Sequence, residues 1–143
     1  MATRWGAPRN AYLFTALIAE GDDSAAAAKW KGLVGAERPD MIIALGAQAR
    51  YAAHLTGRLR GPGAERAIAD AQADKVRHAL GDGRVRDYVI GALSGASADA
   101  AAPECELYEG AVAIARAALH ALYAAGISRM HAALIARRSA RHC

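Results

Sequence analysis

The sequence predicts an all-α protein, a single compact bundle of five to seven helices over residues 1–143. Alanine supplies 39 of the 143 residues, while Phe, Trp and Tyr together supply only 6%. Alanine is the strongest helix former, and sheets favour the aromatic and β-branched residues that this chain uses sparingly. Hydrophobic residues make up 54% and charged residues 22%, which provides a core and excludes an intrinsically disordered chain. This length is typical of one domain.

The first three helices have recognisable start signals. Asn10 is a suitable N-cap for the first, because its side chain can accept a hydrogen bond from the free N–H groups of the first turn. Asp22 or Asp23 caps the second in the same way, and Trp30 within it is predicted to pack in the core. Pro39 opens the third helix, since proline favours the first helical position.

The later helices are separated by breaks that are just as clear. The sequence 61–63, Gly-Pro-Gly, divides the third helix from the fourth. Asp82 is expected to cap the fifth, and the small residues of 94–102 form a loop. Pro103 then opens a long sixth helix, and Ser128 caps the seventh.

The sixth helix is predicted to be amphipathic. At 100° per residue its large apolar side chains share one face, whereas Glu106, Glu109, Arg116 and His120 share the other. We therefore expect a long central helix that presents one polar face to solvent.

The chain is moderately basic. Eighteen Lys and Arg against fourteen Asp and Glu give a net charge of +4, and fifteen of the eighteen cations are Arg. Such a balance is compatible with nucleic acid and also ordinary for a soluble protein. A GC-rich genome would raise Ala, Gly and Arg together, but the guanidinium groups still bind phosphate bidentately and keep their charge.

The sequence carries no signature of a catalytic or metal site. Cys105 and Cys143 are too few for a disulfide framework or a zinc site, and the five histidines lie on separate segments. No Glu-x-x-His pair and no nucleophile-elbow serine occurs. We expect a non-enzymatic protein without metal or cofactor. Since no segment resembles a signal peptide or a membrane span, we expect it in the cytoplasm.

A basic stripe is predicted on the third helix. Arg50, His54 and Arg58 recur at four-residue spacing, opposite an apolar arc that includes Leu55 and Leu59. Apart from Asp40, no acidic residue lies between Glu37 and Glu65, so the stripe has no local counter-charge, and Arg60 extends it. Two interpretations stay open: a track for a phosphate backbone, or a solvated helix face.

Two further groups of arginines are candidates for phosphate contact. Arg84 and Arg86 lie at the expected start of the fifth helix, where a helix–helix turn is the simpler interpretation of the glycines. No acid follows Glu109, whereas the last helix carries Arg129, Arg137, Arg138 and Arg141. Because Arg138 and Arg141 flank Leu134 in angle, residues 137–143 are expected to form a frayed basic tail.

These features leave two function classes. The first is a non-enzymatic subunit of a nucleoprotein assembly, whose arginines contact the backbone of RNA or single-stranded DNA and whose other faces contact protein subunits, among them copies of itself. The second is a helical protein–protein interaction or regulatory module that binds no nucleic acid. In size, helicity and scattered arginines the chain resembles the small helical subunits of CRISPR ribonucleoprotein effector complexes. This resemblance is architectural, rests on no motif and implies no site residue.

Overall fold

The fold is described by a computed structural model, in which residues 6–81, 83–95 and 107–143 are placed. Within these residues the chain forms seven helices and no strand, which confirms the predicted all-α bundle. The helices are α1 (Ala7–Glu20), α2 (Asp23–Lys31), α3 (Glu37–Arg60), α4 (Ala64–Leu80), α5 (Arg84–Ser94), α6 (Tyr108–Ala124) and α7 (Arg129–Arg141). The predicted roles of Asp82 and Pro103, and the predicted loop beyond residue 95, lie outside the described residues.

Two helices begin earlier than the sequence predicts. α1 starts at Ala7 rather than after Asn10, and α3 starts at Glu37 rather than at Pro39. In both, a proline lies within the first turn, where the N–H groups have no partner in the helix, so the missing proline N–H costs nothing. The caps at Asp22 and Ser128 are confirmed, because their side chains accept from backbone N–H groups three residues on, each at 3.1 Å.

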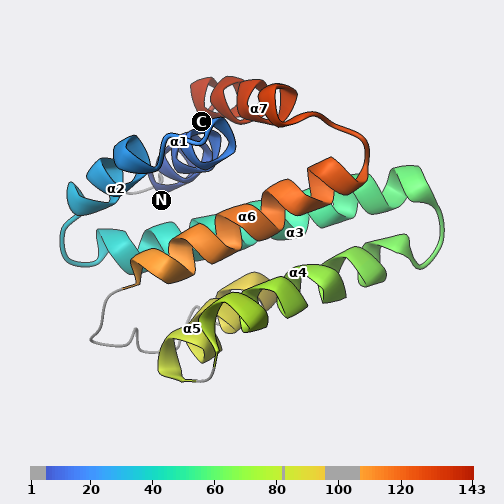
Figure 1. Cartoon of the computed structure of the whole chain (residues 1–143), viewed down its shortest axis with the longest axis horizontal. Helices are drawn as coiled ribbons and strands as arrows, with labels where there is room; N and C mark the ends of the chain where they lie inside the picture. The colour runs from blue at the N-terminus through green and yellow to red at the C-terminus, as the bar shows by residue number, and fades with distance from the viewer. Residues whose placement is uncertain (1–5, 82, 96–106) are drawn as a thin grey trace.

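Helices α3, α4 and α6 form the centre of the molecule (Figure 1). Ala49 of α3 and Ala117 of α6 both contact Gln72 of α4, while Ala53 and Ala121, one turn further along, pack together. α3 and α6 therefore run parallel. α4 runs antiparallel to both, since Ile68 packs beside the pair that lies one turn beyond Gln72.

Small residues set how closely these helices approach. A Cβ atom built on Gly57 of α3 would lie 2.5 Å from the Cα of Glu65 at the start of α4. One built on Gly46 would collide with the carbonyl of Ala92 near the end of α5. Neither contact is possible for any other residue, so α3 touches the backbones of two neighbouring helices at its glycines.

α6 is more deeply buried than the predicted amphipathic pattern indicates. Glu109 and Arg116 are exposed as expected, but Ala113, Ala117 and Ala121, which lie outside the predicted apolar face, are also buried. Alanine contributes little to a hydrophobic face, yet its size lets a second helix pack directly on the backbone. α4 covers this alanine side of α6.

An aromatic cluster joins the first two helices to α6. The rings of Phe14, Trp30 and Tyr108 lie with centroids 6.1 to 6.5 Å apart, in tilted and edge-on arrangements. Such geometries add to the stabilisation that burial of the rings provides. Trp30 is only 2% exposed, which confirms its predicted place in the core.

No single described helix is long and apolar enough to cross a membrane. α6 and α7 reach the required length and composition only when they are joined, and the two are bent by 118° at the break between them.

Gln72 is a buried polar residue at the centre of the bundle. Its side chain is 1% exposed, and Nε2 donates to the carbonyl of Ala49 at 3.0 Å and to that of Ala117 at 3.3 Å. The amide has two N–H groups, so one side chain of α4 binds both partner helices. The two carbonyls also lie within regular helices, so they do not depend on Gln72 for a partner.

We predict different costs for two substitutions of Gln72. Gln72→Ala removes both hydrogen bonds and leaves a cavity, and should lower the free energy of unfolding by about 2–4 kcal/mol. Gln72→Met keeps the volume and leaves no helical carbonyl unpaired, so it should cost about 1 kcal/mol. Urea denaturation followed by circular dichroism measures both. Equal costs for the two variants would show that the amide, rather than the filled space, is what matters.

Candidate nucleic-acid interface

Arg50, the first residue of the predicted basic stripe, binds the end of another helix. Its Nη1 donates to the carbonyl oxygens of Ala92 and Leu93, at 2.6 and 3.2 Å, near the C-terminus of α5. The last carbonyls of a helix lack partners within it, and the negative end of the helix dipole attracts a cation. Gly46, one turn earlier, allows α5 to come this close. Arg50 therefore fastens α5 to α3.

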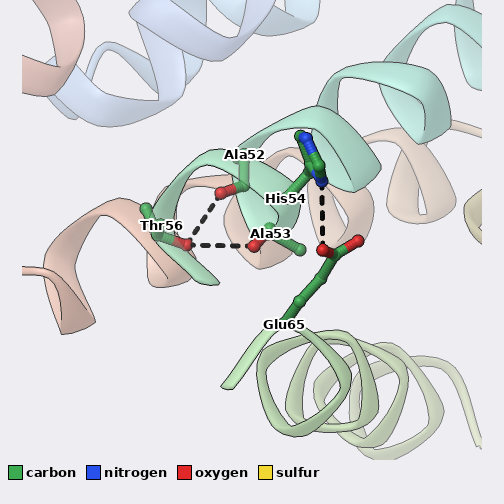
Figure 2. A network of polar contacts seen from close by, with 5 residues as sticks. All are labelled: Ala52, Ala53, His54, Thr56 and Glu65. Carbon is green, nitrogen blue, oxygen red and sulfur yellow. Dashed lines mark hydrogen bonds and ion pairs between the residues drawn. The ribbon is translucent and has the colours of Figure 1, made fainter. Parts of the chain in front are cut away.

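His54, the second residue of the stripe, has a carboxylate partner from the next helix. Its Nδ1 lies 3.0 Å from Oε1 of Glu65, in the first turn of α4 (Figure 2). No acidic residue of α3 lies nearer to the stripe than Asp40, in the first turn of the helix, as the sequence indicates. However, the turn at 61–63 folds α4 back onto α3, and the close approach at Gly57 brings Glu65 within reach.

Figure 2 also shows the hydrogen-bond partners of the Thr56 hydroxyl, on the buried side of α3. The hydroxyl of Thr56, which is 2% exposed, donates to the carbonyl of Ala52 at 2.7 Å and lies 3.4 Å from that of Ala53. This is the usual way in which a buried helical threonine finds a partner within its own helix.

Arg58 and Arg60 remain without a partner in the part of the chain that the structure describes. Both are exposed at the end of α3. Arg60 lines a hollow of about 300 Å³ together with His120 and residues from the start of α4, and no acidic residue lines it. Partial burial lowers the pKa of His120, and the nearby charge of Lys75 lowers it further, so the neutral imidazole is favoured there.

The predicted apolar arc of α3 does not lie wholly in the core. Leu55 is 40% exposed and Leu59 is 83% exposed, and Tyr51 is half-exposed beside them. The second half of α3 therefore presents apolar and basic side chains together. The helical wheel cannot show this, because it does not indicate which part of a helix its neighbours cover.

Arg84 and Arg86 lie away from this end of α3. α4 runs back along α3 for 17 residues, roughly 25 Å, before α5 begins. Arg86 forms an ion pair with Asp87, with Nη2 3.0 Å from Oδ1, whereas Arg84 is exposed without a described partner. Arg84 and Arg86 therefore do not lie beside the basic stripe of α3.

The last helix differs from the predicted basic tail. α7 continues to Arg141, and Arg137 forms a bidentate ion pair with Glu20 of α1, with both N–O distances 2.7 Å. The tail prediction assumed that Leu134 marks the buried face. Instead Leu134 is 63% exposed, and α7 docks on α1 through its alanines, which are Ala132, Ala133, Ala136 and Ala140.

The remaining cations gather on two helices. Arg129, Arg138 and Arg141 are exposed on α7 and, like Arg58 and Arg60, have no described partner. Side chains from 51–55 of α3 and 132–139 of α7 line one common cavity, so these two segments lie on either side of it. We call the exposed side chains of 51–60 and 129–141 the α3–α7 face.

Exposed apolar side chains are also concentrated in this part of the chain. Of the eight large hydrophobic residues exposed in the described chain, seven lie on α3, on α7 or at the end of α6 between them; they are Tyr51, Leu55, Leu59, Tyr123, Met130, Leu134 and Ile135. This surface was not predicted from the sequence. The only available signal was the number of apolar positions on the third and seventh helices, which exceeds what one buried face requires.

The described residues contain no group of three or more His, Cys, Asp or Glu side chains that could hold a metal ion. No family model, no curated protein and no solved structure matches this chain.

We predict that the Glu20–Arg137 pair contributes stability that depends on pH. The hydrogen bond from Arg137 lowers the pKa of Glu20 below its ordinary value of 4.5. A lowered carboxyl pKa stabilises the fold above that ordinary value, and the contribution is lost as pH falls through the folded-state pKa. Because both side chains are about one-third exposed, we expect a coupling energy of only about 0.5–1 kcal/mol at neutral pH.

A double-mutant cycle with Glu20→Gln and Arg137→Gln measures this coupling, in unfolding experiments from neutral pH to well below 4.5. The matched control is the pair of Asp74 and Arg77 within α4, which is longer, at 3.4 Å, and more exposed. The control should show a smaller coupling. A Glu20–Arg137 coupling that persists unchanged in strong acid would contradict the ion-pair explanation.

Proposed function

We propose that this chain is a non-enzymatic helical subunit of a nucleoprotein assembly, which contacts the phosphates of RNA or single-stranded DNA through its α3–α7 face. One observation carries the proposal. Five arginines, Arg58 and Arg60 at the end of α3 and Arg129, Arg138 and Arg141 on α7, are exposed without a carboxylate partner among the described residues. Guanidinium groups keep their charge and match phosphate oxygens bidentately.

The proposed contact set is smaller than the sequence suggested. Four of the predicted residues already bind other groups of the protein; they are Arg50, His54, Arg86 and Arg137. The length of α4 separates Arg84 from the end of α3. The single acid on α1 that faces α7, Glu20, is occupied by Arg137. The face therefore presents a positive potential, which attracts a polyanion and weakens with salt. The architectural resemblance to CRISPR effector subunits belongs to this same proposal.

A protein–protein interaction module is the second candidate, and the exposed apolar residues of the same face favour it. Tyrosine, methionine and arginine are enriched where proteins bind one another, and a contiguous apolar surface is unusual on an isolated protein. In a nucleoprotein subunit the same residues would contact a neighbouring protein chain. The two candidates therefore differ in whether the arginines bind the phosphates of a nucleic acid.

Salt-dependent binding to a single-stranded RNA oligonucleotide tests the proposal. Removal of one arginine that binds a phosphate should reduce the slope of log K against log salt by about 0.7. We predict this reduction for Arg58→Gln and for Arg138→Gln, and about twice as much for the double variant. Arg77→Gln on α4 changes the charge equally and should leave the slope unchanged. Fluorescence anisotropy measures the affinities, and circular dichroism verifies the fold.

Two results would contradict nucleic-acid binding by this face. The first is the absence of binding at low salt, and the second is an equal effect of Arg77→Gln and Arg138→Gln. If RNA does not bind and Leu134→Ser abolishes a protein interaction that is insensitive to salt, the interaction module is supported instead.

A further inference from the structure

The hollow that Arg60 and His120 line lies where the end of α3 meets the start of α4 and the second half of α6. It is open to solvent and has a volume of about 300 Å³. Four residues of α4 line it and share one face of that helix; they are Ala64, Ala67, Ile68 and Ala71. Ala121 and Ala124 of α6 complete the apolar lining. The hollow therefore combines an apolar surface with two basic side chains.

The floor of the hollow belongs to the core of the protein. Ile68 is only 7% exposed and Ala121 is fully buried, and both pack with Ala53 of α3. Ala67 and Ala124, in contrast, are exposed at its rim. All the residues that line the hollow lie within helices, so its shape is set by the packing of α3, α4 and α6.

The two basic side chains start from different ends of the hollow. His120 precedes Ala121, which packs beside Ala53, whereas Arg60 lies seven residues beyond Ala53 on the parallel helix α3. Seven residues of α-helix extend over roughly 10 Å, so the backbones of Arg60 and His120 are separated by about this length along the bundle. No acidic side chain lines the hollow between them.

Arg60 and His120 offer different chemistry to a ligand. The guanidinium of Arg60 is exposed and without a described partner, and such a group binds a phosphate through two parallel hydrogen bonds. Burial lowers the pKa of His120, and the charge of Lys75 lowers it further. The imidazole is therefore favoured in its neutral form, which has one hydrogen-bond donor and one acceptor. An apolar cavity with a few polar groups is the usual form of a ligand site.

We propose that this hollow holds one unpaired nucleotide of the bound strand, with its base on the apolar floor and its phosphate on Arg60. His120 then meets the edge of the base, which carries hydrogen-bond donors and acceptors. The inference rests on the proposed function and narrows its substrate to strands with unpaired bases, because a base within a duplex is not free to leave its stack.

The size of the hollow agrees with a single base. A closed cavity of about 150 Å³ holds benzene, so an open hollow of about 300 Å³ has room for the two fused rings of a purine. Free AMP carries the same base and phosphate and is the alternative source of this ligand chemistry. It lacks the neighbouring phosphates that Arg58 and the arginines of α7 would bind, so we assign the site to a strand.

The affinity for an oligoadenylate, compared with that for a chain of equal length that keeps every phosphate but lacks all bases, tests the inference. Fluorescence anisotropy of the labelled chains measures both. We expect the oligoadenylate to bind about tenfold more tightly, because burial of roughly 60 Å² of apolar base surface is sufficient for this factor. Free AMP at micromolar concentration should not displace the oligoadenylate.

Ala67→Leu fills the hollow from its rim without a change of charge. It should bring the two chains to nearly equal affinity and leave the salt dependence of binding unchanged, because no phosphate contact is lost. Ala69→Leu is the matched control, since Ala69 is exposed on the same helix and does not line the hollow. This control should keep the preference for the oligoadenylate, and circular dichroism verifies that both variants fold.

Substitutions of His120 test its contact with the base. His120→Leu removes the donor and the acceptor, and should weaken binding of the oligoadenylate about fivefold. His120→Gln retains a donor and an acceptor, and should weaken it by less than about twofold. Neither variant should alter the affinity for the chain without bases, whereas a merely structural role of His120 would affect both chains equally.

Three results would overturn the inference. The first is equal affinity for the two chains in the wild type; if Arg58→Gln still reduces the salt slope, the proposed function stands without the hollow. The second is an equal effect of Ala67→Leu and Ala69→Leu on the preference for bases. The third is displacement of the oligoadenylate by micromolar AMP, which would assign the hollow to a free nucleotide. If neither chain binds at low salt, the proposed function fails and the inference fails with it.

Discussion

The close approach of helices through small side chains is the constraint on which this structure depends. Where α3 meets α4 and α5, Gly57 and Gly46 leave no room for a Cβ atom, and α4 packs on the alanine side of α6. Alanine buries little apolar area, so the helices gain stability by bringing their backbones together. Short distances between backbones also let one side chain bind a neighbouring helix, as Gln72 does to α3 and α6.

Because the helices lie so close together, several basic side chains bind groups on a neighbouring helix. Arg50 binds the free carbonyls at the end of α5, His54 meets a carboxylate at the start of α4, and Arg137 clasps Glu20 of α1. Each of these three joins a different pair of helices. In a chain with few large apolar residues, such polar contacts fix which faces of the helices meet, although each exposed pair adds little free energy.

The α3–α7 face carries side chains that these contacts between helices do not use. Arginines without a described partner and exposed apolar residues are both found there. Neither feature is needed to hold the helices together, because α7 docks through its alanines and α3 packs through its opposite side. Apart from His54, which binds Glu65, the exposed side chains of this face therefore have no described role in joining the helices.

Local chemistry determined the all-α class and the caps at Asp22 and Ser128, because each depends on residues close together in the chain, and the large apolar side chain of Trp30 predicted its burial. The sequence also identified the basic residues from which the face is built. Only the tertiary structure decided which of these residues bind a partner within the protein and which side chains are exposed. Glu65 reaches His54 across a turn, Glu20 reaches Arg137 across 117 positions, and Leu134 faces outward. On α7 and in the second half of α3, the large apolar residues do not mark the buried side of the helix, because these segments pack through alanine, glycine and threonine.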